Sequence, residues 1–196
     1  MLYQIHHYPA DLIDVVRIGD GVRVLIRPVL PQDAGLTAAF FSGLPARARH
    51  HRFLAPTREL SPALIKRFTD IDYASHVALV AEVFADGQET VVAEARYAFD
   101  GDPAVAELAV SVAAEWQGRG LGGLLLCKLI RRAADTGISR LVGETLSSNA
   151  AMLRLACKAG FTLTPSANVR GLVELAKVLR PRERAPTQSD GIVRGL

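Results

Sequence analysis

The most constraining feature of this sequence is a glycine-rich turn that joins a predicted strand to a predicted helix. Residues 104–112 are apolar except for Glu107 and Ser111, residues 117–123 read Gln-Gly-Arg-Gly-Leu-Gly-Gly, and an apolar helix follows to about Asp135. The N–H groups at the start of a helix have no partner within it and lie at the positive end of its dipole. The segment therefore predicts a site for a phosphate group.

Two known kinds of phosphate site, the P-loop and the dinucleotide-binding turn, can be compared with this segment. The chain has no Gly-Lys-Ser/Thr sequence there, which excludes a P-loop. Gly118, Gly120 and Gly123 satisfy the dinucleotide pattern G-x-G-x-x-G, and Glu144 follows 21 residues after the last of them. That pattern normally follows its strand at once, whereas residues 113–117 intervene here. A dinucleotide site is therefore the weaker alternative.

A third reading comes from a family resemblance. The run Gln117-Gly-Arg-Gly-Leu-Gly resembles the Q/R-x-x-G-x-G/A signature of the GNAT family of N-acetyltransferases, and Val112 stands five residues before it, where the fourth strand of that family ends. Residues 149–161 resemble the Asn-led helix of the family, which ends in Gly-Phe before the last strands. The resemblance covers residues 22–178. It implies that acetyl-CoA is the acyl donor substrate.

The resemblance implies an α/β fold in which a mixed, mainly antiparallel sheet is flanked by helices and a cleft opens between the splayed fourth and fifth strands. We expect an N-terminal arm (1–21), one acetyltransferase domain (22–179) and a mobile basic tail (180–196). Strands are predicted at 22–27, 76–84, 89–99, 104–112, 140–145, 161–163 and 169–178. Helices are predicted at 34–44, after the N-cap candidates Asp33 and, further on, Ser61, then up to Asp135 and at 149–159.

The family resemblance also implies where the donor binds. The N–H groups of Arg119, Gly120 and Gly122 would hold the pyrophosphate, and the backbone of Val110 and Val112 would pair with the pantetheine arm. Arg119 could add a charged contact to phosphate or point to solvent. The complete set of expected cofactor-binding residues is Val110, Val112, Gln117, Gly118, Arg119, Gly120, Leu121, Gly122 and Asn149.

Glu107 is the candidate general base. A free lysine has a pKa near 10.4, so an acceptor amine must lose a proton before it attacks the thioester. Glu107 lies in an otherwise apolar strand, and in protein-acetylating relatives the pattern Ala-Glu-x-Ala-Val carries the glutamate assigned this role. We expect burial to make it a better base, with a structural pair to an arginine as the alternative role. Ala156 stands where many relatives have a tyrosine acid.

A finer resemblance concerns the acceptor. Val22-Arg-Val-Leu-Ile-Arg-Pro, Arg52-Phe53 and residues 68–73 look like the acetyltransferase domain of bacterial protein lysine acetyltransferases. This resemblance implies that the acceptor amine belongs to a protein lysine. The alternatives are a small-molecule amine, a peptide N-terminus, or a non-catalytic module that only binds acyl-CoA.

Composition limits which partners, cellular location and metal sites we expect for this protein. The net charge of +3 equals the excess of bases in residues 177–196, so the body is near neutral and we expect no nucleic-acid partner. No apolar run is long enough for a membrane span, so we expect no membrane partner and a cytoplasmic protein. Cys127 and Cys157 are thirty residues apart, which predicts buried thiols and no metal site. His50 and His51 are expected in a solvated, charge-rich loop, with the lining of an acidic acceptor groove as the alternative.

Overall fold

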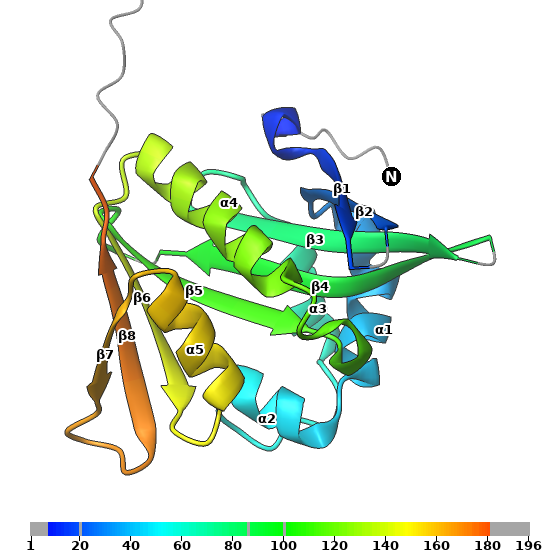
Figure 1. Ribbon diagram of the computed structural model, residues 1–196. Helices are drawn as coiled ribbons and strands as arrows, with labels where there is room; N and C mark the ends of the chain where they lie inside the picture. The colour runs from blue at the N-terminus through cyan, green and yellow to red at the C-terminus, as the bar shows by residue number, and fades with distance from the viewer. Residues whose placement is uncertain (1–7, 20, 86, 100, 181–196) are drawn as a thin grey trace, which may run out of the picture.

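The computed structural model describes residues 8–19, 21–85, 87–99 and 101–180 (Figure 1). The strands are β1 (Asp14–Ile18), β2 (Val22–Pro28), β3 (His76–Ala85), β4 (Gln88–Ala98), β5 (Val105–Val112), β6 (Arg140–Leu146), β7 (Thr162–Pro165) and β8 (Leu172–Val178). The helices are α1 (Ala34–Gly43), α2 (Ala46–Phe53), α3 (Pro62–Thr69), α4 (Leu121–Asp135) and α5 (Ala150–Lys158). Short 3-10 turns are η1 (Ala10–Leu12), η2 (Pro31–Asp33) and η3 (Ala114–Trp116).

Within the described residues the strands form one sheet in the order β1-β2-β3-β4-β5-β6-β8-β7. Neighbouring strands are antiparallel except β5 and β6, which run parallel. A parallel pair cannot be closed by a hairpin, and here α4 makes the crossover. The predicted fold class, an α/β domain with a mainly antiparallel sheet flanked by helices, is confirmed.

The two faces of the sheet carry separate apolar cores. One core packs the stripe Leu121, Leu125, Leu126 and Leu129 of α4 against the sheet, together with buried residues of α5. The other packs Phe40, Phe41 and Phe68 of α1 and α3 against the opposite face. Figure 1 shows the same arrangement, with α4 in front of the strands and α1 and α3 behind them.

The pairing between β5 and β6 is short. It covers only Val105–Glu107 against Arg140–Val142, although β5 continues to Val112 and β6 to Leu146. Beyond Glu107 and Val142 the two strands diverge. The expected splay between these strands is therefore present, and Glu107 is the last residue of β5 that is paired to β6.

The N-terminal region differs from the expected arm. Residues 14–18 form the edge strand β1, which pairs antiparallel with β2 over its whole length. This strand was not predicted from the sequence, although Val15, Val16 and Ile18 are apolar, because a five-residue edge strand depends on its partner for hydrogen bonds. The predicted basic tail, 180–196, lies outside the described residues except for Arg180.

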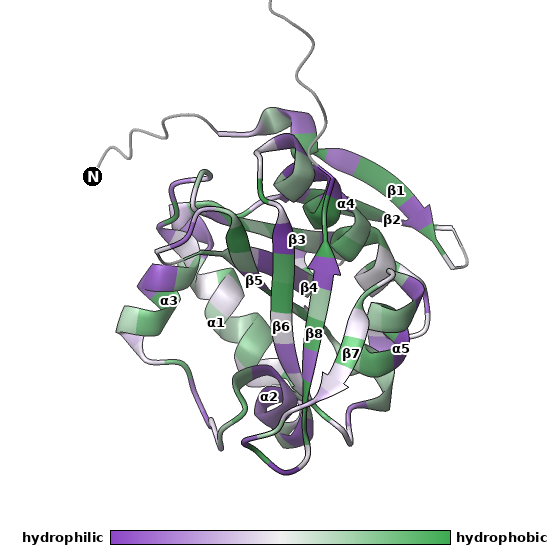
Figure 2. Cartoon of the chain, turned by 90° about the vertical axis from the view of Figure 1, so that its left-hand side faces the viewer, coloured by the Kyte–Doolittle hydropathy of each residue, from purple (hydrophilic) through white to green (hydrophobic). Residues whose placement is uncertain are grey.

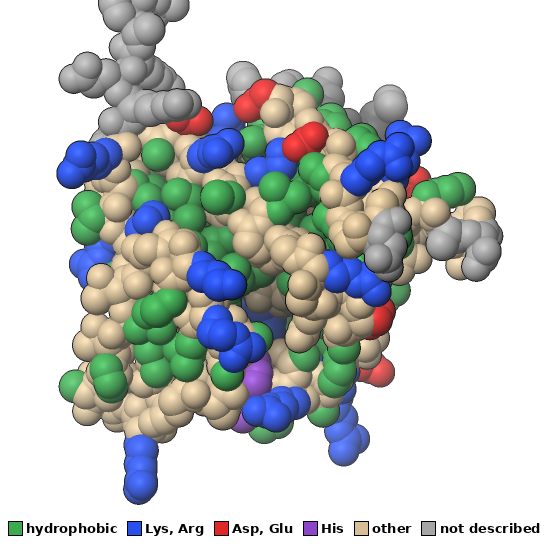
Figure 3. All heavy atoms as spheres, in the orientation of Figure 1, with side chains coloured by type: hydrophobic (Ala, Val, Ile, Leu, Met, Phe, Trp, Pro, Cys, Tyr) green, Lys and Arg blue, Asp and Glu red, His purple; other side chains and the backbone are tan. Residues whose placement is uncertain are grey.

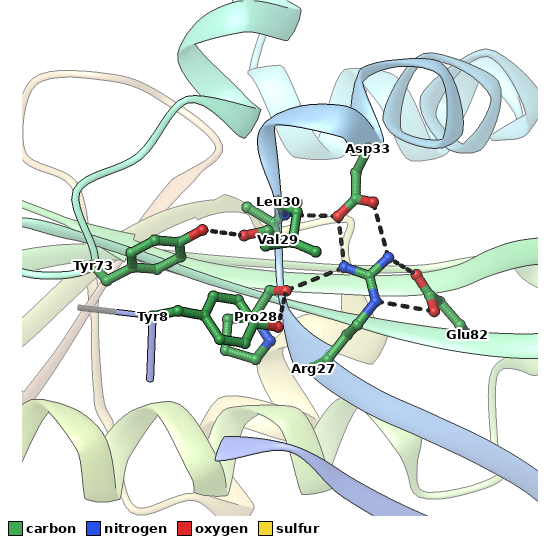
Figure 4. A network of polar contacts seen from close by, with 8 residues as sticks. All are labelled: Tyr8, Arg27, Pro28, Val29, Leu30, Asp33, Tyr73 and Glu82. Carbon is green, nitrogen blue, oxygen red and sulfur yellow. Dashed lines mark hydrogen bonds and ion pairs between the residues drawn. The ribbon is translucent and has the colours of Figure 1, made fainter. Parts of the chain in front are cut away.

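Asp33 does not cap α1 as expected. Its carboxylate accepts hydrogen bonds from the Arg27 guanidinium at 2.6 and 2.8 Å and from the Leu30 N–H at 2.7 Å. Arg27 also bonds Glu82 on β3, so one cation joins two buried carboxylates (Figure 4). The predicted cap of α3 is confirmed, because the Ser61 hydroxyl accepts the Leu64 N–H at 3.2 Å.

Both cysteines are exposed, so the prediction of buried thiols is wrong. Leu125 belongs to the stripe of α4 that packs on the sheet. Cys127 follows it by two residues, a rotation of about 200° around the helix, and therefore points away from the sheet. Cys157 follows the buried Ala156 and points away from the sheet in the same way. Because α4 has apolar residues on most of its faces, its sequence did not show which face packs on the sheet.

Candidate active site

A cleft of about 500 Å³ opens where β5 and β6 part. Its walls come from β5, from the glycine turn before α4, from α5 and from α2. Residues of both sheet faces line it, for example Val110 on the α4 face and Ser111 on the α2 face, so the cleft passes between the strands. In the space-filling view of Figure 3, Lys and Arg side chains surround a hollow in this face, with histidine at its lower rim.

The glycine turn forms one end of the cleft. Gly118 and Gly120 have φ angles of +75° and +85°, a conformation in which side chains with a Cβ are strained. The first backbone bond of α4 runs from the Leu124 N–H to the Gly120 carbonyl at 3.1 Å, so the N–H groups of the first helical turn precede any helical partner. A Cβ on Gly122 would lie 3.4 Å from the Val112 side chain. Glycine thus permits both the turn and its close approach to β5.

The edge of β5 that faces the cleft carries unpaired backbone groups. Ala113 donates its N–H to Val92 on β4 at 2.9 Å, and polar groups of alternate residues point to opposite sides of a strand. Val110 and Val112 therefore direct their N–H and carbonyl groups toward β6, where pairing has ended. The Val112 carbonyl accepts a hydrogen bond from the Gln117 side chain at 3.0 Å.

Arg119 and Trp116 form the outer rim of the turn. The indole is partly buried against the main core, and it also lines the cleft. The exposed guanidinium of Arg119 lies 4.9 Å above the ring centre, within the range of a cation–π contact. This stacking keeps a positive charge beside the N–H groups of Gly120 and Leu121.

Asn149 caps α5. Its Oδ1 accepts the Met152 N–H at 3.2 Å, and its Nδ2 donates to the Thr145 hydroxyl at 3.1 Å. The cap fixes the start of α5 against the end of β6, and Asn149 also lines the cleft. The buried Ala156, at the position of the family tyrosine, places no hydroxyl there.

Glu107 stands at the point where the strands part, and its side chain is exposed to the cleft. The burial expected for Glu107 is absent, because its side chain faces the cleft and is not covered by a helix. Within the described residues its carboxylate has no hydrogen bond and no ion pair, so the alternative of a structural pair with an arginine is not what the structure shows. Arg52 also lines the cleft, and the Glu107 charge opposes the lowering of the Arg52 pKa by burial.

Arg52 forms the other wall of the cleft, on α2. The sequence suggested a loop at residues 47–52, but these residues are helical, and α2 spans the gap between β5 and β6. The guanidinium lies 5.2 to 6.0 Å from the ring centres of Phe41, Phe53 and Phe68. Burial lowers the pKa of Arg52, and the charges of Glu94 and Glu107 oppose that shift, so it stays a cation.

A buried ion pair lies behind Arg52. Glu94 and Arg96, 1% and 5% exposed, are neighbours on β4 and bind each other. Arg96 also contacts His76 Nε2 at 3.0 Å and lies 3.8 Å from the centre of the Phe68 ring. Burial, followed by the charge of Arg96, lowers the pKa of His76 to about 4. His76 is therefore neutral at ordinary pH.

Several cleft residues were not predicted from the sequence. Arg154 and Lys158 line the cleft from α5, and their i, i+4 spacing on the Asn-led helix could have indicated a shared basic face. Glu144 lines it from β6, at a position that sequence analysis had considered only for a dinucleotide site. No local signal identifies Arg52, because its place depends on how α2 packs.

Comparison with known proteins decides the family. The profile of the Acetyltransferase (GNAT) family matches residues 47–161, more than half of the chain. This chain belongs to the GNAT family of acetyltransferases. The predictions of family membership and of an N-acetyltransferase are confirmed.

Individual relatives agree with this family. An acetyltransferase of Pseudomonas aeruginosa is 37% identical over 147 residues, which are 75% of this chain and 79% of that protein. The acetyltransferase Pat of Mycolicibacterium smegmatis is 32% identical over 146 residues, 74% of this chain but 43% of that longer protein.

Solved GNAT structures share the fold. The GNAT domain of S. lividans PAT superposes with a TM-score of 0.79 at 30% identity, over 88% of this chain and 100% of that one. The Salmonella typhimurium protein yncA, solved with its cofactor acetyl-CoA, has a TM-score of 0.64 at 26% identity, over 83% of this chain and 96% of that one. In the part of this chain that the structure describes, no helix has the length and apolar character to cross a membrane.

Proposed function

We propose that this enzyme transfers the acetyl group of acetyl-CoA to a protein lysine, with Glu107 as the general base. The observation that carries the proposal is the position of Glu107, an unpaired carboxylate at the point where β5 and β6 part. The glycine turn and the open edge of β5 adjoin the same cleft. One opening thus offers an anion site, an extended backbone edge and a base.

The donor site follows from these groups. The N–H groups of Arg119, Gly120 and Gly122 would bind the pyrophosphate of acetyl-CoA, and Arg119 adds a positive charge nearby. The backbone of Val110 and Val112 would pair with the amides of the pantetheine arm. Since the Val112 carbonyl already accepts from Gln117, its N–H is the group left for the donor. Gln117, Gly118, Leu121 and Asn149 shape the same surface.

The reaction is a direct attack in a ternary complex. Glu107, directly or through a water molecule, takes a proton from the lysine ammonium, and the neutral amine attacks the thioester carbonyl. A β5 N–H group would stabilise the oxyanion of the tetrahedral intermediate. The C–S bond then breaks. Since Ala156 offers no acid, the CoA thiolate takes its proton from the attacking nitrogen, which becomes the amide nitrogen, or from solvent, in which case the nitrogen releases its proton to solvent.

The protein-lysine acceptor is supported by the likeness to the S. lividans PAT domain and to the M. smegmatis protein Pat. Residues of α2 and Glu107 line the same cleft, so an acceptor side chain that reaches Glu107 would pass beside α2. A small amine, a peptide N-terminus and a non-catalytic acyl-CoA-binding role are the alternatives that an acceptor screen distinguishes.

Glu107→Gln tests the mechanism. The amide keeps the shape of the carboxylate but cannot take a proton, so we expect the acetylation rate to fall by about 10²–10⁴. The affinity for acetyl-CoA, measured by calorimetry, should change little. Glu174→Gln, an exposed acid on β8 outside the cleft, is the matched control. An unchanged rate for Glu107→Gln would remove this residue from the mechanism.

Binding and acceptor identity need separate measurements. Calorimetry with acetyl-CoA beside NAD tests the donor site, and we expect only acetyl-CoA to bind. Incubation with candidate proteins, followed by mass spectrometry of acetyl-lysine, tests the acceptor. Labelling no greater than in an enzyme-free reaction would refute the lysine acceptor while leaving acetyl-CoA binding intact.

A further inference from the structure

The acceptor end of the cleft holds two opposite charges that, within the described residues, make no hydrogen bond and no ion pair but lie close enough to affect each other. Glu107 provides the negative one, and Arg52 the positive one. Within the described residues Arg52 makes no hydrogen bond and no ion pair, and its Nε is buried without a partner. A partly buried guanidinium without a hydrogen-bond partner costs free energy, and a ligand that accepts its hydrogen bonds would remove that cost.

The guanidinium of Arg52 is held in place by aromatic rings. Phe41, Phe53 and Phe68 lie around it at cation–π distance, and they belong to three different helices. Behind it, Glu94 binds Arg96 through Oε1, whereas its Oε2 is buried without a hydrogen bond; Glu94 makes no ion pair with Arg52, although its charge favours the Arg52 cation. Such a clamp fixes the direction of the N–H groups and lowers the entropy cost of binding an anion.

The surface around Arg52 is basic as well. Helix α2 reads Ala-Arg-Ala-Arg-His-His-Arg-Phe and has no acidic residue, and Figure 2 shows it largely in the hydrophilic colour. Arg47 donates to the Ser148 carbonyl at 3.2 Å, which places it beside the loop between β6 and α5. Arg47, His50 and Arg58 also line a second hollow of about 390 Å³ on α2. This surface complements an acidic segment of a partner.

We propose that Arg52 binds an acidic side chain next to the acceptor lysine, so that the enzyme selects lysines with a neighbouring Asp or Glu. The inference rests on the proposed lysine acceptor. The lysine ammonium approaches Glu107 while the neighbouring carboxylate pairs with Arg52, so each of these two charges meets its opposite. A planar guanidinium suits this role because it can bind a carboxylate with two parallel hydrogen bonds.

The test uses peptides with a single lysine, a blocked N-terminus and an amidated C-terminus, so that no terminal charge competes. Acid-flanked peptides carry Glu or Asp within two residues of the lysine, and their matched partners carry Gln or Asn. With saturating acetyl-CoA, we expect kcat/KM to be about tenfold higher for the acid-flanked peptides, mainly through KM, and the ratio to shrink at high salt.

Variants assign the preference to Arg52. Arg52→Met keeps an unbranched side chain among the rings and removes the charge, so the ratio between acidic and neutral peptides should fall to near one. Arg52→Lys should retain part of the ratio, and Arg23→Met, an exposed arginine on β2, should retain all of it. Acetyl-CoA affinity and circular dichroism of each variant verify that the donor site and fold persist.

Each other result overturns the inference in its own way. Equal rates on acidic and neutral peptides, or a ratio that survives in Arg52→Met, would refute the role of Arg52 while the lysine acceptor stands. Acetylation of free amino acids but of no peptide would mean that the carboxylate is the α-carboxylate of a small acceptor. Acetyl-CoA binding without turnover of any of these acceptors would refute the lysine proposal and this inference together.

Discussion

The buried ion cluster around Arg27 gives the sharpest stability prediction. Arg27 on β2 lies between Asp33 of η2 and Glu82 of β3, and the three side chains are 13%, 4% and 6% exposed (Figure 4). Two tyrosines lie beside this cluster. The Tyr8 hydroxyl donates to the Pro28 carbonyl at 3.1 Å, and the Tyr73 hydroxyl donates to the Val29 carbonyl at 2.8 Å. The cluster fixes the segment that leads from the sheet into α1.

Arg27→Met removes the cation and keeps an unbranched apolar side chain of similar reach. Asp33 and Glu82 then remain buried with no counter-ion, and the loss of one partner from a buried ion pair costs about 3–5 kcal/mol. Folded domains have stabilities of about 5–15 kcal/mol, so the variant stays folded but loses a large share. Arg23→Met, four residues earlier on the same strand and exposed, should change stability by no more than about 0.5 kcal/mol.

Equilibrium urea unfolding at pH 7 measures this cost, and its pH dependence gives a second test. Burial raises the pKa of Glu82, and Arg27 opposes that shift. Without Arg27 only the upward shift persists, so folded Glu82 binds its proton more tightly than unfolded Glu82, and protonation stabilises the variant as pH falls. The deficit of Arg27→Met should therefore shrink between pH 7 and about pH 5. A deficit below about 1 kcal/mol at pH 7, or one that grows on acidification, would refute this reasoning.

Three further predictions concern the cleft and the helix surfaces. A Cβ on Gly143 would lie 3.1 Å from the Leu108 carbonyl oxygen beside Glu107, so Gly143→Ala should lower kcat/KM about tenfold without changing the circular dichroism spectrum; an unchanged kcat/KM would contradict this. The pKa of His76 is lowered to about 4, so NMR should show a neutral ring down to that pH. The free energy of unfolding should fall as the pH is lowered from about 6.5 to 4, because His76 of the unfolded chain binds its proton first. A ring that titrates near 6.5 would contradict this. Cys127 and Cys157 should both react with a thiol reagent in the folded protein at the rate of free thiols, and slow reaction would contradict their exposure.

Local signals were sufficient for most of the fold. The β3–β4–β5 segment was predicted as three strands separated by turn residues, and the positive φ angles of Gly137 and Gly160 confirm the predicted ends of α4 and α5. Ser61 caps its helix as its sequence context indicated. These features depend on neighbours within a few residues, so a single sequence contains the information for them.

Helix α2 shows what the sequence could not indicate. Its residues have no apolar period, and tertiary contacts hold it in place. The Arg49 side chain donates to the carbonyls of Ser42, Leu44 and Thr57, and Phe53 packs on Phe68 of α3. These partners lie outside the helix, so its sequence alone resembles a solvated loop. The position of Arg52, and with it the acceptor end of the cleft, depends on these contacts.

The donor site and the opening for the acceptor have one structural cause. β5 and β6 are parallel, so the chain must cross over the sheet between them, and the crossover helix α4 starts after the short connection 113–120 that follows β5. That start is the glycine turn, which offers N–H groups beside the open edge of β5. Because pairing with β6 ends at Glu107, this carboxylate lies at the closed end of the gap between the two strands. The sequence identified the turn and the glutamate separately, whereas their distance along the cleft is set by the register of β5 on β6, which no local pattern encodes.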